Sequence, residues 1–224
     1  MKLTILYDNE VCRKGLKPGF GFSCLIEAAG RNILFDVGWD GGILLHNMKA
    51  LDLNPPEVDV IVLSHEHWDH AGGLNQVLAE VGDVVVYVPA SFSDNMKKEI
   101  KLRAGLTEVK GPQELLEGVY STGELPGTGR YPDIREQSLA VKSREGLVVV
   151  TGCSHPGLDV ILKKASGFGK LYGVVGGFHG FNRYDALKGL ELIVPTHCTV
   201  HKKEIRDRYK DKVEQGGVGW SKEI

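Results

Sequence analysis

One short segment of the chain holds an unusual density of potential metal ligands. Residues 64–70 read Ser-His-Glu-His-Trp-Asp-His, which places three imidazoles and two carboxylates within six residues. The segment directly follows 58–63, a continuous apolar run that predicts a buried strand. The polar side chains therefore leave the sheet together at the end of that strand. Imidazole nitrogen and carboxylate oxygen suit zinc, iron or manganese, so the segment indicates a metal site rather than a polar loop.

The spacing within this segment is compatible with two neighbouring metal ions. His65 and His67 are two residues apart and could share one ion across a bend. Asp69 and His70 are adjacent and could bind a second ion beside the first.

Strand and helix patterns alternate along the rest of the chain. Strands are expected over 3–7, 23–28, 32–36, 58–63, 84–88, 138–141, 147–151, 171–175 and 190–194, with a last one over 212–215. Helices are expected over 42–51, 71–81, 91–102, 156–166, 185–188 and 199–209. The Gly- and Pro-rich stretch 107–135 predicts loops around short strands, which could shape a substrate pocket or be an inert connection. Both halves mix the two element types, so we expect one layered α/β domain over 1–224.

Composition narrows the expected partners and compartment. The 27 basic and 29 acidic residues leave a net charge of −2, which gives no basic surface for nucleic acid. No apolar run approaches the roughly 20 residues of a membrane span, and the N-terminus is not typical of a signal peptide. We therefore expect a cytoplasmic protein that acts on a small molecule and contacts neither membrane nor nucleic acid. Free thiols are expected at Cys12, Cys24, Cys153 and Cys198.

Several stretches match a known family signature. His65-x-His67-x-Asp69-His70, continued by Gly72-Gly73-Leu74, resembles the signature motif of the metallo-β-lactamase superfamily. Residues 35–38, Phe-Asp-Val-Gly, resemble the strand end that precedes this motif, and the resemblance implies that Asp36 orients a ligand histidine. It also implies a four-layer αββα sandwich of the α/β class. The cofactor it implies is a pair of divalent metal ions, zinc in preference to iron or manganese.

Further motifs resemble one branch of that superfamily. They lie at 7–9, 19–27, 33–36, 47–48, 151–157, 176–179 and 195–199. The branch includes the archaeal dihydropterin-ribofuranosylaminobenzene phosphate synthases and many hydrolases. The resemblance extends over nearly the whole chain but is weak evidence for a substrate, because one fold and one site can host many reactions.

Histidines after the motif are candidates for completing the site. His197 matches the last ligand histidine of the superfamily, and His155 is a candidate ligand with substrate binding as its alternative. His179 is expected to contact substrate or metal, with a loop histidine as its alternative. His46 and His201 fall within helical patterns and are expected to be structural or exposed.

The chain departs from the family pattern after the strand expected over 147–151. Typical hydrolases of the superfamily place a metal-bridging Asp there as Gly-Asp, whereas this chain has Gly152-Cys153. The usual middle histidine is also absent, and Glu136 and Gln137 stand in that region. Cys153 could be a thiolate ligand, which favours zinc or iron, or a small buried core residue. His155 could instead take over a ligand role.

The leading hypothesis is hydrolysis of a small phosphorylated or ester-like substrate by a metal-bound hydroxide at a dinuclear site. The first metal would be held by His65, His67 and His155, and the second by Asp69, His70 and His197. Asp69 would also act in catalysis by taking a proton from the nucleophile. His179 would act in catalysis and substrate binding, by holding a phosphate or stabilising developing negative charge.

Three alternatives belong to other functional classes. The first is a synthase that transfers a dihydropterin group with loss of pyrophosphate, as the branch resemblance implies. The second is a diiron oxygen-reducing centre, against which His67 argues, because the flavodiiron proteins carry Glu at that position. The third is a non-catalytic module that binds metal or ligand.

Overall fold

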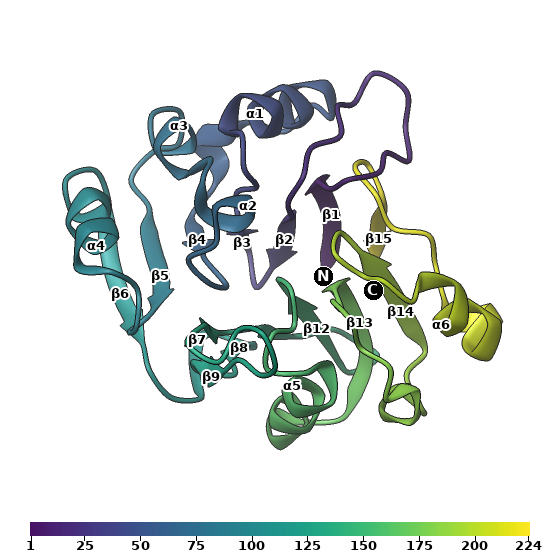
Figure 1. The fold of residues 1–224 in the computed structure, drawn as a ribbon. Coiled ribbons are helices and arrows are strands. Elements are labelled where there is room, and N and C mark those ends of the chain that lie inside the picture. Colours follow the sequence, from purple (N-terminus) through teal and green to yellow (C-terminus); the bar gives the residue numbers. More distant parts are fainter.

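Two β-sheets packed face to face form the centre of the computed structural model, which describes residues 1–224 (Figure 1). The larger sheet contains, in spatial order, β15 (Ser221–Glu223), β1 (Lys2–Tyr7), β2 (Ser23–Ala28), β3 (Arg31–Phe35), β4 (Val60–Val62), β5 (Val85–Pro89) and β6 (Gly105–Val109). The smaller sheet contains β14 (Leu192–Thr196), β13 (Leu171–Gly177), β12 (Leu147–Thr151), β11 (Leu139–Lys142), β8 (Val119–Ser121) and β7 (Gln113–Leu116). A separate two-stranded ribbon pairs β9 (Leu125–Pro126) with β10 (Arg135–Glu136).

Helices cover the outer face of each sheet. The α-helices are α1 (Gly41–Ala50), α2 (Trp68–Ala71), α3 (Leu74–Val77), α4 (Asp94–Lys101), α5 (Leu158–Ala165) and α6 (Lys202–Tyr209). Short 3₁₀ helices lie at η1 (Pro55–Glu57), η2 (Ser166–Phe168), η3 (Tyr184–Leu187) and η4 (Lys210–Lys212). The first four α-helices lie on the side of the larger sheet and the last two on the side of the smaller (Figure 1). None of these helices combines the length and the apolar character needed to cross a bilayer.

Three hydrophobic layers explain why the central strands are apolar on both faces. On β3, Ile33 and Phe35 face the core between the two sheets, whereas Leu34 faces the helices outside the larger sheet. On β12, Val148 lies in the core between the sheets and Val149 in the third layer, under the helices of the smaller sheet. Successive side chains of a strand point to opposite faces, so a strand covered on both sides needs apolar residues throughout. The expected four-layer αββα sandwich is confirmed.

The sheets bring the carboxyl ends of several strands to one region. β3, β4 and β5 are mutually parallel in the larger sheet, and β12, β13 and β14 are parallel in the smaller. Parallel neighbours end at the same edge of a sheet, which is where ligand sites of α/β proteins form. The chemistry-bearing loops therefore meet although they are far apart in the sequence.

Two of the expected elements are wrong, whereas the short strands expected within 107–135 are confirmed. The helix expected over 71–81 is interrupted, because Gly72 and Gly73 separate α2 from α3 and pack tightly against neighbouring backbone. The strand expected over 212–215 is absent: η4 occupies its start, Val213 forms only an isolated bridge to Ile193, and β15 is the edge strand instead. The stretch 107–135 contains β7, β8 and β9 and most of β6.

Candidate metal centre

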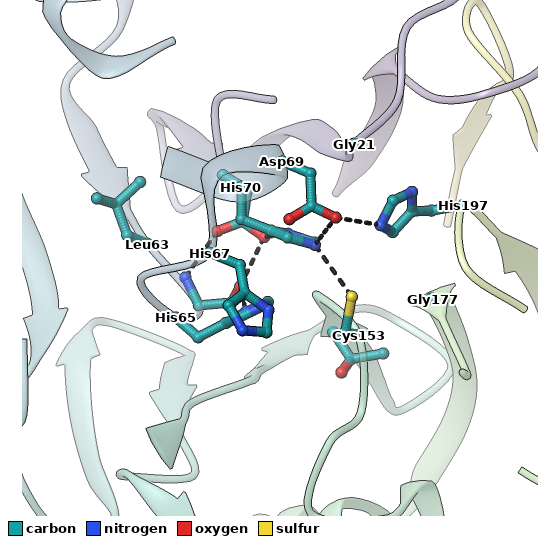
Figure 2. Close-up of polar contacts among 12 residues, drawn as sticks. Gly21, Leu63, His65, His67, Asp69, His70, Cys153, Gly177 and His197 are labelled. Carbon is teal, nitrogen blue, oxygen red and sulfur yellow. Dashed lines mark hydrogen bonds and ion pairs between the residues drawn. The ribbon is translucent and has the colours of Figure 1, made fainter. Parts of the chain in front are cut away.

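The residues predicted for the site converge from the ends of strands in both sheets (Figure 2). From the larger sheet, Asp36 follows β3, His65 and His67 follow β4, and α2 carries Asp69 and His70. From the smaller sheet, Cys153 and His155 follow β12, His179 follows β13 and His197 follows β14. The structure thus brings together side chains that the sequence separates by more than a hundred residues.

The backbone at these strand ends is unusual. Asp36, Ser154, His179 and His197 have φ values of 56°, 61°, 45° and 44°. These are four of the six non-glycine residues in the chain with positive φ. The left-handed region is costly for such residues and persists where surrounding contacts enforce it, often at functional sites. The strained residues therefore lie at the strand ends that carry the polar side chains of the site.

Asp36 organises the part of the centre that comes from the larger sheet. Its Oδ1 accepts a hydrogen bond from the Ser64 backbone N–H at 2.7 Å, and its Oδ2 accepts one from the Ser64 hydroxyl at 2.7 Å. The same Oδ2 lies 2.7 Å from Nδ1 of His70, and Ser64 Oγ lies 2.8 Å from Nδ1 of His65. Both rings are fully buried, and each leaves its Nε2 facing the interior of the centre. Asp36 therefore lies where it fixes the orientation of the His70 ring directly and that of the His65 ring through Ser64.

Glu136 and Asn9 play the same part for the two later histidines. Glu136 Oε2 lies 2.9 Å from Nδ1 of His155, and Asn9 Oδ1 lies 3.0 Å from Nδ1 of His197. Four imidazoles therefore have their Nδ1 held by a polar neighbour, and in three of them Nε2 contacts another potential ligand. This arrangement is typical of metal-binding histidines, whose second nitrogen is fixed by an outer partner.

One group of four donors lies close enough together to hold an ion. Its members are Asp69, His70, Cys153 and His197, and their donor atoms all lie within 4.8 Å of one another. His70 Nε2 is 3.1 Å from Cys153 Sγ, and His197 Nε2 is 3.1 Å from Asp69 Oδ2 (Figure 2). Two nitrogens, one sulfur and one carboxylate oxygen form a donor set that suits zinc or iron.

A second group adjoins the first and shares the sulfur. His65, Cys153 and His155 also have donor atoms within 4.8 Å of one another. His67 lies outside that set, but its Nδ1 is 3.1 Å from His65 Nε2, and its ring centroid is 4.9 Å from that of His155. Cys153 is thus common to both groups, at the position where family hydrolases carry the bridging Asp.

Burial sets the protonation of several of these groups. It raises the pKa of the Cys153 thiol and lowers the pKa of His65 well below its usual value, with neighbouring histidines adding to the latter shift. Burial also lowers the pKa of His197 to about 4. Neutral imidazole is the form that binds a metal, whereas the thiol has to lose its proton on binding. His65 and His197 are therefore in the form that binds a divalent cation, whose charge would compensate a buried thiolate.

In two other groups of the centre, ion pairing determines the direction of the pKa shift. Burial opposes charge on His70, but Asp36 outweighs it and raises the pKa of His70 to about 9. Burial likewise opposes ionisation of Asp69, but the nearby His197 and His70 lower its pKa to about 2. Asp69 is therefore ionised at neutral pH.

The remaining predicted histidines occupy different places. The His179 ring lies 5.4 Å from His155 and 5.5 Å from Tyr131, outside both donor groups and on the wall of a cavity. His46 contacts the Gly15 carbonyl, and His201 lies beside Glu204; neither approaches the centre.

Several residues with a place in the site were not identified from the sequence. Asn9 belonged to a family motif but gave no sign that it would hold His197. The sequence shows only that Glu136 stands where a histidine is usual, and Tyr131 lies in the stretch 107–135, which has no interpretable motif. The centroid of the Tyr131 ring lies 5.7 Å from that of His67 and 4.8 Å from that of His155. Contacts of this kind depend on the tertiary fold rather than on local spacing.

Comparison with known proteins identifies a family model and a relative that match most of the chain. Residues 16–167 match the family model of the metallo-beta-lactamase superfamily. The chain is 28% identical to a 7,8-dihydropterin-6-methyl-4-(beta-D-ribofuranosyl)-aminobenzene-5'-phosphate synthase of Methanocaldococcus jannaschii, over 90% of this chain and 88% of the other.

Solved structures show the same fold. A metal-dependent hydrolase of the beta-lactamase superfamily superposes with a TM-score of 0.82 at 26% identity, over 100% of this chain and 99% of the other. A metallo-beta-lactamase fold protein from Bacillus subtilis superposes with a TM-score of 0.73 at 13% identity, over 99% of both chains. The second likeness bears on the fold alone.

Proposed function

Because the chain belongs to the metallo-beta-lactamase superfamily, we propose that it is a metal-dependent hydrolase acting on a small phosphorylated or ester-like substrate. The observation that carries the proposal is the orientation of the four anchored imidazoles. Each has its Nδ1 held by an outer partner, and each belongs to a group of close donors that includes Cys153. A polar loop without a ligand-binding role has no reason to align donors in this way.

The proposal includes two divalent ions, zinc in preference to iron or manganese. One set of ligands is His65, His67 and His155, and the other is Asp69, His70 and His197. Cys153, which lies within reach of both sets, would contribute its sulfur between them. A thiolate at that position favours zinc or iron over harder cations.

Such ions would polarise the reacting group and lower the pKa of a coordinated water toward about 7. The chain's own groups have complementary tasks. Asp69 is ionised and only 15% exposed, so it can accept a hydrogen bond or a proton from the attacking nucleophile. Burial lowers the pKa of His179, so its neutral ring can donate an N–H hydrogen bond to developing negative charge.

Metal content and turnover test the proposal together. Elemental analysis of protein purified without added metal should give about two zinc or iron ions per chain. His67→Ala should lower that number, whereas the control His201→Ala, at a half-buried position away from the centre, should not. The metal-loaded protein is then assayed on phosphoesters, pyrophosphates and lactones, and hydrolysis of at least one class is expected. Metal-loaded protein without turnover on any of them would refute the hydrolase and favour a binding module.

A dihydropterin-transferring synthase is the second candidate, because the synthase relative aligns with nine-tenths of this chain. In that reaction a dihydropterin diphosphate would be joined to an aminobenzene ribotide with release of pyrophosphate. Mass spectrometry of a mixture of the two compounds separates the candidates. A joined product that forms only when both compounds are present would replace the hydrolase proposal with the transferase.

A further inference from the structure

A cavity of about 330 Å³ opens beside the candidate metal centre. Its polar wall is formed by Arg130, Tyr131, His155, His179, Asn182 and Arg183. No carboxylate lines this cavity, although acidic residues slightly outnumber basic ones in the chain as a whole. We call it the arginine cavity, because two guanidinium groups dominate its charge.

The first arginine is carried by a loop that is fastened to the metal centre. Thr128 donates hydrogen bonds from its backbone N–H and its hydroxyl to the carbonyl of His155, at 3.0 and 3.1 Å. The loop is closed by a hydrogen bond from the Gly127 N–H to the Ile134 carbonyl at 2.7 Å. Arg130 projects from this closed loop and forms no ion pair within the chain. Its charge is therefore available to a ligand.

The second arginine follows β13 and pairs with a carboxylate of α5. Arg183 Nη2 lies 2.6 Å from Asp159 Oδ1, and the Arg183 side chain remains 63% exposed. A guanidinium carries five N–H donors in a fixed plane, so one carboxylate contact leaves others free. Asp159 thus orients Arg183 and offsets one unit of charge, which leaves the unpaired charge of Arg130 in the cavity.

Tyr131 connects the arginine cavity to the centre. Its ring centroid lies 4.8 Å from that of His155, 5.5 Å from that of His179 and 5.7 Å from that of His67. His155 is itself a member of both the cavity wall and a candidate ligand set. A small molecule in the cavity would consequently reach the centre with one end.

We propose that the arginine cavity binds the phosphate of a phosphomonoester substrate while the bond that reacts lies at His155 and His65. The placement of the reacting bond rests on the proposed function, whereas phosphate binding does not. Guanidinium groups match the geometry of phosphate oxygens and bind them through paired hydrogen bonds. A volume of about 330 Å³ exceeds the needs of one phosphate and leaves room for a small organic group attached to it.

Binding to the metal-free protein tests the cavity without the ions. Ribose 5-phosphate is titrated calorimetrically into chelator-treated protein, with ribose as the uncharged control. Ribose 5-phosphate should bind and ribose should not. Arg130→Gln and Arg183→Gln should each weaken binding about tenfold, the effect of losing one hydrogen bond to a charged group. The matched control is Arg144→Gln, at the turn between β11 and β12, which should bind like the wild type.

The possible outcomes separate the cavity from the enzyme activity. Equal binding of ribose and ribose 5-phosphate would refute phosphate binding in the arginine cavity, even if the enzyme hydrolyses other esters. Arginine variants with wild-type affinity would refute it as well. Arginine-dependent binding without any hydrolysis would support phosphate binding in the cavity and refute the proposed hydrolase activity. If both hold, Arg130→Gln should raise KM for a phosphorylated substrate about tenfold and leave KM for an uncharged ester unchanged.

Discussion

Replacing Glu136 with Gln should destabilise the protein far more than a typical carboxylate-to-amide change. Glu136 is 1% exposed, and four N–H donors point at its two oxygens. Oε1 accepts from the backbone N–H groups of Cys153 and Ser154, at 2.9 and 2.8 Å. Oε2 accepts from the backbone N–H of His155 at 2.8 Å and pairs with its Nδ1 at 2.9 Å. The carboxylate thus holds the whole turn that carries two candidate ligands.

The magnitude follows from this geometry. Gln has the same shape but exchanges one acceptor oxygen for an NH₂ group, which would face two N–H donors. Each hydrogen bond to a charged group contributes about 1.5–3 kcal/mol, so losing two costs about 3–6 kcal/mol. A protein of this kind has about 5–15 kcal/mol of stability in total, so the loss is large.

Urea unfolding of chelator-treated protein at neutral pH, followed by tryptophan fluorescence, measures the difference. The control is Glu114→Gln, because the exposed Glu114 accepts a single bond from the Gly118 N–H, and it should change the free energy of unfolding by less than about 0.5 kcal/mol. A Glu136→Gln loss below about 1 kcal/mol would refute the view that the carboxylate holds this turn.

The pH dependence supplies a second readout for the same variant. Burial opposes ionisation of Glu136, but the hydrogen bond from His155 and the nearby His65 hold its pKa well below the usual range. A depressed folded-state pKa gives stability that is present above the unfolded value of about 4.3 and is lost as the pH falls below it. The difference in the free energy of unfolding between wild type and Glu136→Gln should therefore shrink as the pH is lowered below about 4. A difference that stays constant into acid would contradict an ionised Glu136.

Three further predictions concern the centre and one surface group. Cys153→Ser should lower the zinc content measured by elemental analysis, whereas the control Cys12→Ser, at an exposed cysteine outside both donor groups, should not; wild-type zinc content in Cys153→Ser would exclude Cys153 as a ligand. Asp36→Asn should weaken zinc affinity about 10–100-fold in a chelator competition, because the amide no longer fixes His70 as the carboxylate does; unchanged affinity would contradict that role. A backbone N–H and an arginine lower the pKa of Asp59, so Asp59→Asn should cost about 0.5–1 kcal/mol in urea unfolding at neutral pH. That cost should vanish as the pH falls through and below 3.8, and a cost that persists there would refute the ionic contribution.

The fold and the candidate donors were largely predictable, because both depend on patterns within short stretches of the sequence. Apolar runs such as 147–151 give strands whatever their distant partners are, and the residues after them emerge at the strand ends. The family signature at 65–70 then identified the fold. The break between α2 and α3 could also have been read from Gly72-Gly73, since two adjacent glycines weaken a helix.

The outer contacts of the site were not predictable in the same way. Asn9 reaches His197 across 188 residues, and nothing near either residue indicates the pairing. Arg130 and Arg183 come from two loops that are far apart in the sequence and line the same cavity in the folded chain. Their side chains are exposed and irregularly spaced, so no periodic pattern marks them. Such residues are visible only when the loops have been placed in three dimensions.

The distribution of buried charge gives an independent reason to expect cations at the centre. Asp8 and Asp36 are fully buried, and neither of them pairs with a lysine or an arginine. Asp69 and the Cys153 thiol add two more potential anions. Burying uncompensated charge is costly, and burial indeed raises the pKa of Asp8 to about 6 and raises that of Asp36. Two divalent cations would supply four positive charges within this ring of acidic groups and make their ionised forms favourable. Metal binding should therefore stabilise the fold as well as the site, because the added positive charge would offset the cost of burying Asp8 and Asp36 in their ionised forms.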